Sequence, residues 1–286
     1  MYIIFKQIEA MLLKNKNAII YGGGGLLSGT IARAFGAAGA NVFVTGRHAD
    51  NIEKVVSDIV AAGGNAEAAV VDAMDEYAVN AHIEEVVAKA DTVDISFNLI
   101  GILAPPNVPM VTLSADEFMY PVTNSVKTLF ITGIAAAKIM MKQGNGVILS
   151  LTNTAGGTAY PMLGGCGTAL SAMEAFSRNL ACEIGAYGVR SVNIRSGGSP
   201  DSAPFVNAAA VVGEEAARSI IDKLTTDTML KAMPMMAEIA SVAVFLASDM
   251  AAKITGTTID VTSGTTNALN YKANYIKGEK ANAAGL

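Results

Sequence analysis

Cysteine, histidine and long apolar runs are all scarce in this sequence of 286 residues. Its two cysteines, Cys166 and Cys182, are too few for a disulfide framework, so we expect a reducing, cytoplasmic setting. With two histidines and no Cys/His/Asp cluster at ligand spacing, no metal site is expected. No apolar run reaches about 18 residues without a charge, which argues against a membrane span.

Charge is also sparse, at 16% of residues with a net charge of −5. No basic stripe is present, so we expect neither nucleic acid nor an anionic membrane as a partner. Hydrophobic residues make up 51% of the chain. That composition and length suit one large α/β domain over residues 1–286, with a buried core and a small-molecule substrate.

Short β-rich runs alternate with longer helical patterns along the chain. The predicted strands are 17–21, 41–45, 66–71, 93–98, 146–151, 189–194 and 257–261. The predicted helices are 26–38, 49–62, 76–89, 114–142, 161–187 and 236–248. Because several strands are almost wholly apolar, they are expected to be parallel and covered on both faces. This pattern predicts a doubly wound Rossmann fold with a seven-stranded parallel sheet and helices on both faces.

Two segments lack this regular pattern. Residues 196–233 have weak periodicity and follow the sixth strand, where an open α/β sheet keeps its ligand crevice. We interpret them as a mobile substrate lid, with an ordinary surface insertion as the alternative. The polar tail, 265–286, is expected to lie on a neighbouring molecule or to fray.

The stretch AIIYGGGGLLSGTIARAF joins the first strand to the first predicted helix. Glycine lets a turn approach a pyrophosphate closely, and the helix start supplies unpaired N–H groups. The turn therefore predicts a dinucleotide site. Its expected residues are Gly22, Gly24, Gly25, Leu27 and Ser28.

The residues at the ends of the following strands indicate which dinucleotide is bound. After the second strand the chain has Thr45-Gly46-Arg47, where an NAD binder usually carries an acidic residue. A guanidinium can hold a 2′-phosphate, so NADP(H) is favoured over NAD(H), although Arg47 as a plain surface arginine remains open. Asp72 is expected at the adenine amino group. Asn98 and Gly101 are expected beside the cofactor.

With these motifs the chain resembles the short-chain dehydrogenase/reductase family over about residues 14–264. The family's TGxxxGxG turn corresponds to Tyr21 through Ser28, and its NNAG motif to Asn98-Leu99-Ile100-Gly101. The stretch EIASVAVFLASDMAAKITG matches the family's end motif closely, and Asn124 matches its helix asparagine. The resemblance implies a nicotinamide cofactor, with Gly197 following the sixth strand beside it.

The family's active-site motifs are altered in this chain. The serine position holds Asn153, the tyrosine position Cys166 and the lysine position Leu170. Ketone reduction needs a proton donor, and a tyrosine serves well only when a cation lowers its pKa. Leucine cannot do this, and an apolar site keeps a cysteine neutral. By resemblance and position, the catalytic candidates are Asn124, Asn153, Cys166 and Tyr160.

Three functions remain open at this point. The first is an NADP(H)-dependent reductase acting on a small carbonyl or enoyl substrate through a non-standard site. The second is a cofactor-binding sensor or scaffold without turnover. The third is non-redox chemistry on the same frame, such as that of a lyase or isomerase. The missing acid favours the second, while the retained glycine turn and Asn124 favour the first.

Residues 143–173 contain no Asp, Glu, Lys or Arg, and the preceding helix is sparsely charged. Two such faces are costly in water, so we expect them to pack across a two-fold axis. The sequence therefore predicts a homo-oligomer, either a dimer or a tetramer.

Overall fold

The computed structural model describes residues 12–102, 108–207, 210 and 212–267. Its strands form one parallel sheet in the order β3-β2-β1-β4-β5-β6-β7. They are β1 (Asn17–Tyr21), β2 (Asn41–Gly46), β3 (Asn65–Val70), β4 (Ile95–Asn98), β5 (Gly146–Asn153), β6 (Val189–Ser196) and β7 (Thr258–Val261). The predicted seven-stranded Rossmann fold is confirmed, with strand bounds within two residues of those expected.

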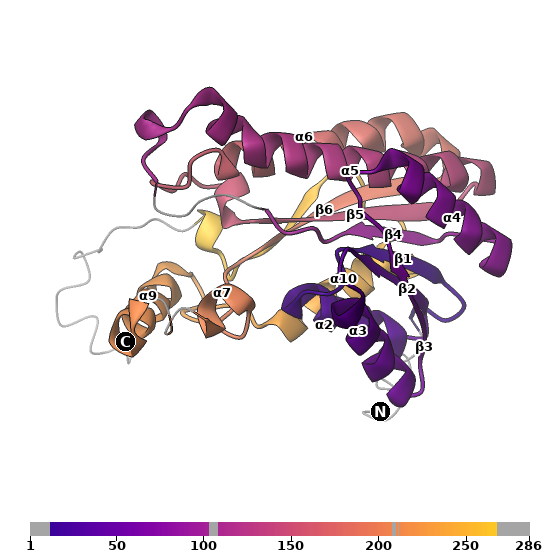
Figure 1. Cartoon of the computed structure of the whole chain (residues 1–286), viewed down its shortest axis with the longest axis horizontal. Helices are drawn as coiled ribbons and strands as arrows, with labels where there is room; N and C mark the ends of the chain where they lie inside the picture. The colour runs from indigo at the N-terminus through magenta and orange to yellow at the C-terminus, as the bar shows by residue number, and fades with distance from the viewer. Residues whose placement is uncertain (1–11, 103–107, 208–209, 211, 268–286) are drawn as a thin grey trace, which may run out of the picture.

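Helices cover both faces of the sheet (Figure 1). One layer consists of α2 (Leu26–Ala37), α3 (Ala49–Ala61) and α10 (Met236–Ala247). The other consists of α4 (Glu76–Ala90), α5 (Ala115–Gln143) and α6 (Cys166–Ile184). Within the described ranges, no helix is both long enough and apolar enough to cross a membrane.

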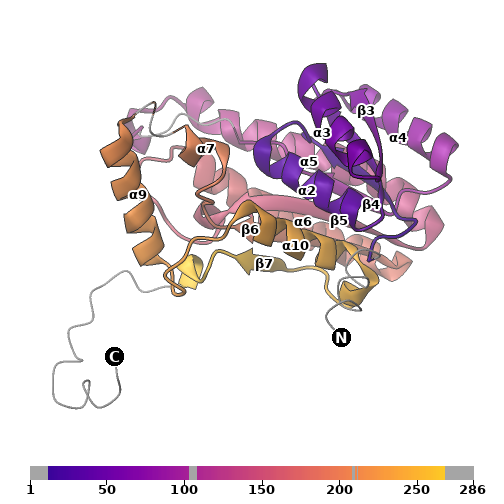
Figure 2. The same cartoon turned by 90° about the horizontal axis from the view of Figure 1, so that it is seen from below.

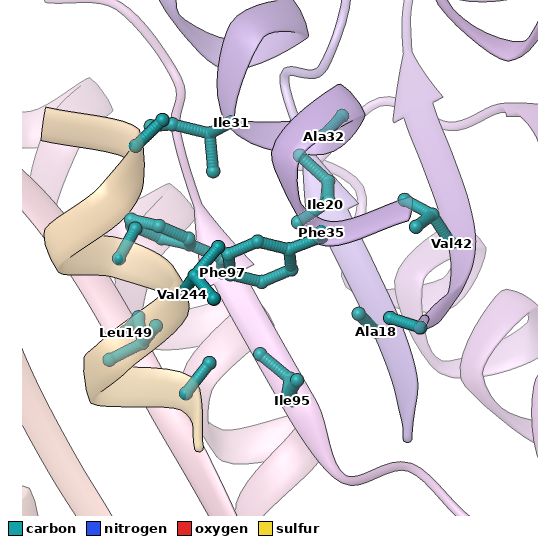
Figure 3. Packing of buried hydrophobic residues seen from close by; sticks show 14 of the residues in the cluster. Ala18, Ile20, Ile31, Ala32, Phe35, Val42, Ile95, Phe97, Leu149 and Val244 are labelled. Carbon is teal, nitrogen blue, oxygen red and sulfur yellow. The ribbon is translucent and has the colours of Figure 1, made fainter. Parts of the chain in front are cut away.

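The core is divided by the sheet into two apolar clusters, one under each helix layer. In the layer of α2 and α10, Phe35 packs against Phe97 with 6.3 Å between ring centroids. Ile20 and Val244 close around this pair, as Figure 3 shows. These side chains come from β1, α2, β4 and α10, so their burial joins both ends of the chain.

The start of α6 differs from the predicted helix, which began at residue 161. The helix begins at Cys166, five residues later. Met162 and Gly164 have φ values of 66° and 52°, which no right-handed helix contains. Gly165 then sits tightly against the first turns of α5, because a Cβ there would collide with the carbonyl oxygen of Phe118.

Within its described residues, the segment 196–233 contains α7 (Ala203–Val206) and α9 (Glu214–Asp227), which the sequence did not predict. They lie together at one end of the sheet in Figure 2. Asp201 accepts a hydrogen bond from the N–H of Met236 at 3.1 Å, and Met229 N–H donates to Ser263 O at 2.9 Å. Of the predicted tail, 265–267 form a short 3₁₀ turn, and 268–286 lie outside the described residues.

The close packing at Gly165 predicts that Gly165→Ala destabilises the protein. Overpacking a tight contact costs about 1–3 kcal/mol, because the α5 backbone must move. Gly185→Ala is the matched control: its φ is −60° and no atom lies within 4 Å of an added Cβ. This control should be neutral or stabilise by about 0.4–1 kcal/mol. Urea unfolding of both variants measures the difference, and equal stabilities would contradict the packing.

Candidate functional site

A cleft of about 380 Å³ opens at the carboxyl edge of the sheet. It lies between the loops after β1 and β4, where the strand order changes direction, the usual ligand position in an open α/β sheet. The structure brings seven of the predicted site residues to this cleft. They are Gly22, Gly24, Gly25, Arg47, Asp72, Gly101 and Asn124.

The glycine turn is shaped by close backbone contacts. Gly22 has a φ of 76°, and a Cβ there would lie 3.0 Å from the carbonyl oxygen of Leu99. A Cβ at Gly24 would lie 2.9 Å from the Cβ of Asn51. Gly25 then caps α2 without a side chain, which leaves the helix's positive end open toward the cleft.

Two residues predicted beside the cofactor, Leu27 and Ser28, lie at the start of α2 but do not face the cleft. The Ser28 hydroxyl accepts a hydrogen bond from Gly25 N–H at 3.0 Å and is buried, with 6% of the residue exposed. Leu27 packs on the apolar core. Neither lines the cleft. The sequence placed both correctly at the helix start, but the turn of the helix directs them inward.

Charged groups stand at the ends of β2 and β3. The exposed Arg47 guanidinium forms no ion pair with any residue that the structure describes. Asp72 accepts a hydrogen bond from Met74 N–H at 3.0 Å through one carboxylate oxygen. The cleft wall therefore offers one cation and one anion on neighbouring strands.

Asn98 is buried behind the cleft rather than in its wall. Its amide donates to the Thr132 hydroxyl at 3.0 Å, and its carbonyl oxygen accepts from Ile100 N–H at 3.2 Å. These bonds hold the end of β4 against α5. Asn98 thus positions Ile100 and Gly101, which do line the cleft.

One face of α5 forms the far wall through Tyr120, Asn124, Ser125 and Thr128. The Asn124 amide donates to the Tyr120 carbonyl oxygen at 2.9 Å, which leaves its own oxygen for other partners. Sequence reasoning missed Tyr120, which is 52% exposed. The signal was its spacing of four residues from Asn124, which places both on one helix face.

The remaining predicted residues lie outside this cleft. Tyr160 and Gly197 line a second cavity of about 30 Å³ together with Thr154. Asn153 ends β5, is exposed, and accepts a hydrogen bond from Ala155 N–H at 2.9 Å. The structure thus separates the predicted residues into two groups.

Cys166 is the first residue of α6 and is partly buried. Burial raises the pKa of its thiol, which favours the neutral form. One turn later Leu170 is only 1% exposed. No group of three or more metal-ligating side chains occurs within the described ranges.

A cluster of charges near these residues was not predicted from the sequence. Arg195 lies between Glu174 and Asp260, at 2.5 and 3.3 Å from their carboxylates. The hydrogen bonds to Glu174 raise the pKa of the guanidinium. No local motif marks these residues, because they come from α6, β6 and β7.

Comparison with known proteins gives consistent matches over nearly the whole chain. Residues 27–266 match the family model described as enoyl-(acyl carrier protein) reductase. A 7α-hydroxysteroid dehydrogenase of Escherichia coli is 29% identical, covering 92% of this chain and 98% of its own. A 2,3-dihydro-2,3-dihydroxybenzoate dehydrogenase of Bacillus subtilis is 26% identical, covering 91% and 99%.

Solved structures share the fold. A short-chain type dehydrogenase/reductase from Mycobacterium ulcerans superposes with a TM-score of 0.82 at 23% identity, covering 90% of this chain and 92% of its own. Levodione reductase gives a TM-score of 0.82 at 24% identity, covering 90% and 100%. From the family-model match, supported by these relatives and by the architecture of the sheet, the chain belongs to the short-chain dehydrogenase/reductase family of oxidoreductases.

Proposed function

We propose that this protein is an NADP(H)-binding oxidoreductase of one domain that acts on a small carbonyl or enoyl substrate through a non-standard active site. The observation that carries the proposal is the convergence of the glycine turn, Arg47 and Asp72 on one cleft. Relatives that match the chain include a 3-oxoacyl-[acyl-carrier-protein] reductase of Chlamydia trachomatis, 27% identical.

The cleft fits a dinucleotide by its shape and its donors. A side chain at Gly22 or Gly24 would collide with neighbouring protein atoms, and the start of α2, where Gly25 has no capping side chain, favours a phosphate. Arg47 would hold a 2′-phosphate, and the second carboxylate oxygen of Asp72 would accept from the adenine amino group. These are the residues we expect to bind NADP(H).

Bound NADP(H) would supply or accept the hydride, while the protein binds, orients and protonates the substrate. Asn153 uses its carbonyl oxygen to hold the turn after β5, so its NH₂ group can donate to a substrate oxygen. Asn124 keeps its carbonyl oxygen as an acceptor. Neither amide is an acid of useful strength.

This site differs from the family's motif at the residue that would donate the proton. The Cys166 thiol is held neutral by burial, and Leu170 offers no cation to activate it. The alternative donors are the phenols of Tyr160, in the second cavity, and Tyr120, in the cleft. Tyr160 lies in the cavity that the 196–233 segment also lines, which makes it the better placed of the two, while Tyr120 shares the cleft wall with Asn124.

A binding protein without turnover is the second candidate function. Leu170 favours it, because a side chain with 1% exposure on the sheet side of α6 is a packing residue. In this case the cleft would still take NADP(H), and binding would serve sensing or assembly. Cofactor titration alone cannot separate the two functions, whereas turnover measurements do.

The segment 196–233 is proposed to cover the substrate. Its residues Gly197, Leu224 and Met233 line the cavity that also contains Tyr160. The apolar side chains among them suit a small apolar substrate. Motion of this lid would require the hydrogen bond between Asp201 and Met236 to open.

We also propose self-association through α5 and α6. Phe130 on α5 is 48% exposed and meets Phe176 of α6 edge to face, with ring centroids 6.0 Å apart. An exposed aromatic side chain packed on a partly buried one, on a weakly charged surface, is typical of an interface core. A second copy of the chain is the expected partner.

Arg47→Ala should weaken NADP(H) binding about ten- to a hundredfold, since charge-assisted hydrogen bonds contribute about 1.5–3 kcal/mol. NAD(H) affinity should change little, because it lacks the 2′-phosphate. Isothermal titration with both cofactors measures this. Unchanged NADP(H) affinity in the variant, or equal affinities in the wild type, would refute the specificity.

Wild-type protein should reduce ordinary ketones poorly, because a tuned general acid contributes about 10²–10⁴-fold and is missing. The variant Asn153→Ser/Cys166→Tyr/Leu170→Lys should gain activity well beyond any single change. Thermal melts must first show that it folds, since Leu170 is buried. Ordinary wild-type rates would contradict the loss of the acid, and Tyr120→Phe compared with Tyr160→Phe would then identify the group that replaces it.

Sedimentation at micromolar concentration should give a dimer or tetramer. Phe130→Glu should shift the protein toward monomer, because a charge would be buried in the interface. Tyr187→Glu is the control, since Tyr187 has a similar exposure of 51% outside α5 and α6. A wild-type monomer at these concentrations would rule out this interface.

A further inference from the structure

Arg195, Glu174 and Asp260 form a cluster of charges that the proposed chemistry does not use. Arg195 donates to Glu174 through Nε at 2.9 Å and through Nη2 at 2.5 Å, and to Asp260 through Nη1 at 3.3 Å. The side chains of Arg195 and Glu174 are only 15% and 11% exposed. A charge pair this well buried must be well bonded to be tolerated.

The strand register brings these residues together. Arg195 on β6 stands beside Asp260 on β7 and beside Thr152 on β5. The Thr152 hydroxyl donates to Glu174 at 2.9 Å and accepts from the Asn193 amide at 2.7 Å. Glu174 Oε1 therefore accepts two hydrogen bonds and Oε2 one, so the carboxylate joins α6 to β5 and β6.

The loop after β5 lies directly on this pair. A Cβ at Gly156 would collide with the Glu174 carboxylate, and one at Gly157 would lie 2.5 Å from the Arg195 guanidinium carbon. The Ser171 hydroxyl of α6 donates to Gly156 O at 3.2 Å. Backbone therefore rests on the two charged groups with no intervening side chain.

The same loop contains the candidate catalytic groups outside the cleft. Asn153 follows Thr152 directly, and Tyr160 lies a few residues beyond Gly157. The loop also reaches the first turn of α6, since a Cβ at Gly167 would lie 3.3 Å from Ala155 O. Because Cys166 directly precedes Gly167, we expect a shift of the pair to displace Asn153 and to increase the exposure of Cys166.

We propose that Glu174 and Arg195 are positioning residues that hold the 153–160 loop, with Asn153 and Tyr160, in place over the start of α6. A catalytic role for the loop rests on the proposed function, whereas the position of the loop does not. A purely structural role differs in one respect: it would require the pair for the stability of the whole fold. Replacing a buried ion pair by apolar residues is often neutral for stability, so the two roles can be separated.

The test uses Cys166 as a reporter in the full-length Cys182→Ser background, because the chain has only these two cysteines. Glu174→Gln should raise both the thiol's alkylation rate and amide exchange at residues 154–158 about tenfold, since a charge-assisted bond is lost. Asp58→Asn is the matched control. It removes the exposed pair with Arg33, 3.2 Å long, and should change neither readout.

Glu174→Met/Arg195→Met decides between positioning and general stability. We expect a melting temperature close to that of the parent, with the thiol and the 154–158 amides still about tenfold more reactive. Restoration of both readouts in the double variant would overturn the proposal, as would unchanged readouts in Glu174→Gln. If Glu174→Gln does not fold, the double variant alone decides between the two roles by the same criterion.

NADPH titration of the same proteins keeps this proposal distinct from the proposed function. Neither Glu174 nor Arg195 lines the cleft, so the variants should bind NADPH as the parent does. A parent protein that does not bind NADPH would defeat the proposed function and leave the loop measurements valid. A variant that loses NADPH binding while its loop stays protected would overturn the positioning role.

Discussion

The parallel pairing of all seven strands is the constraint on which the rest of the structure depends. Consecutive parallel strands must be joined by a crossover connection, which returns the chain to the same edge of the sheet. β1 has β2 on one side and β4 on the other, so the loops after β1 and β4 turn away from each other. The cleft opens there because these two loops leave the carboxyl ends of β1 and β4 uncovered.

The two faces of the sheet are covered by different kinds of contact. Under α2 and α10 the contacts are mainly apolar, as around Phe35 and Phe97, although Arg190 of β6 donates to Leu246 O of α10 at 2.8 Å. Under α6 the strands β5 and β6 present hydrogen-bonding side chains, and Ser150 donates to Asn193 at 2.8 Å. Such a layer adds little net stability, but it permits only a few arrangements of the strand ends. The Glu174–Arg195 pair lies at the open end of this polar layer.

The site consequently has two parts with different physical characters. The cleft near β1 to β4 is built from glycine backbone and exposed charge, which suits a phosphate-bearing ligand. The region of Asn153, Tyr160 and Cys166 is built on a loop that rests on a buried ion pair. Binding and proton transfer would therefore respond to different substitutions, which is why the proposed oxidoreductase and the binding protein can be separated by experiment.

The order and type of the strands and of helices α2 to α6 and α10 were determined by the sequence alone, because periodicity, glycine turns and caps act between chain neighbours. Helix α9 was missed, because its segment has weak periodicity. Ser114 and Glu117, for example, cap α5 where the pattern predicted its start. The site was only half predictable. The glycine turn, Arg47 and Asp72 stand at strand ends that periodicity locates, whereas Ser28, Asn98 and Leu27 proved to support the cleft from behind. The place of Tyr120 in the wall and the meeting of Arg195 with Asp260, 65 residues apart, were decided by tertiary structure. Those contacts depend on strand register and helix rotation, which packing between distant parts of the chain sets and no local pattern records.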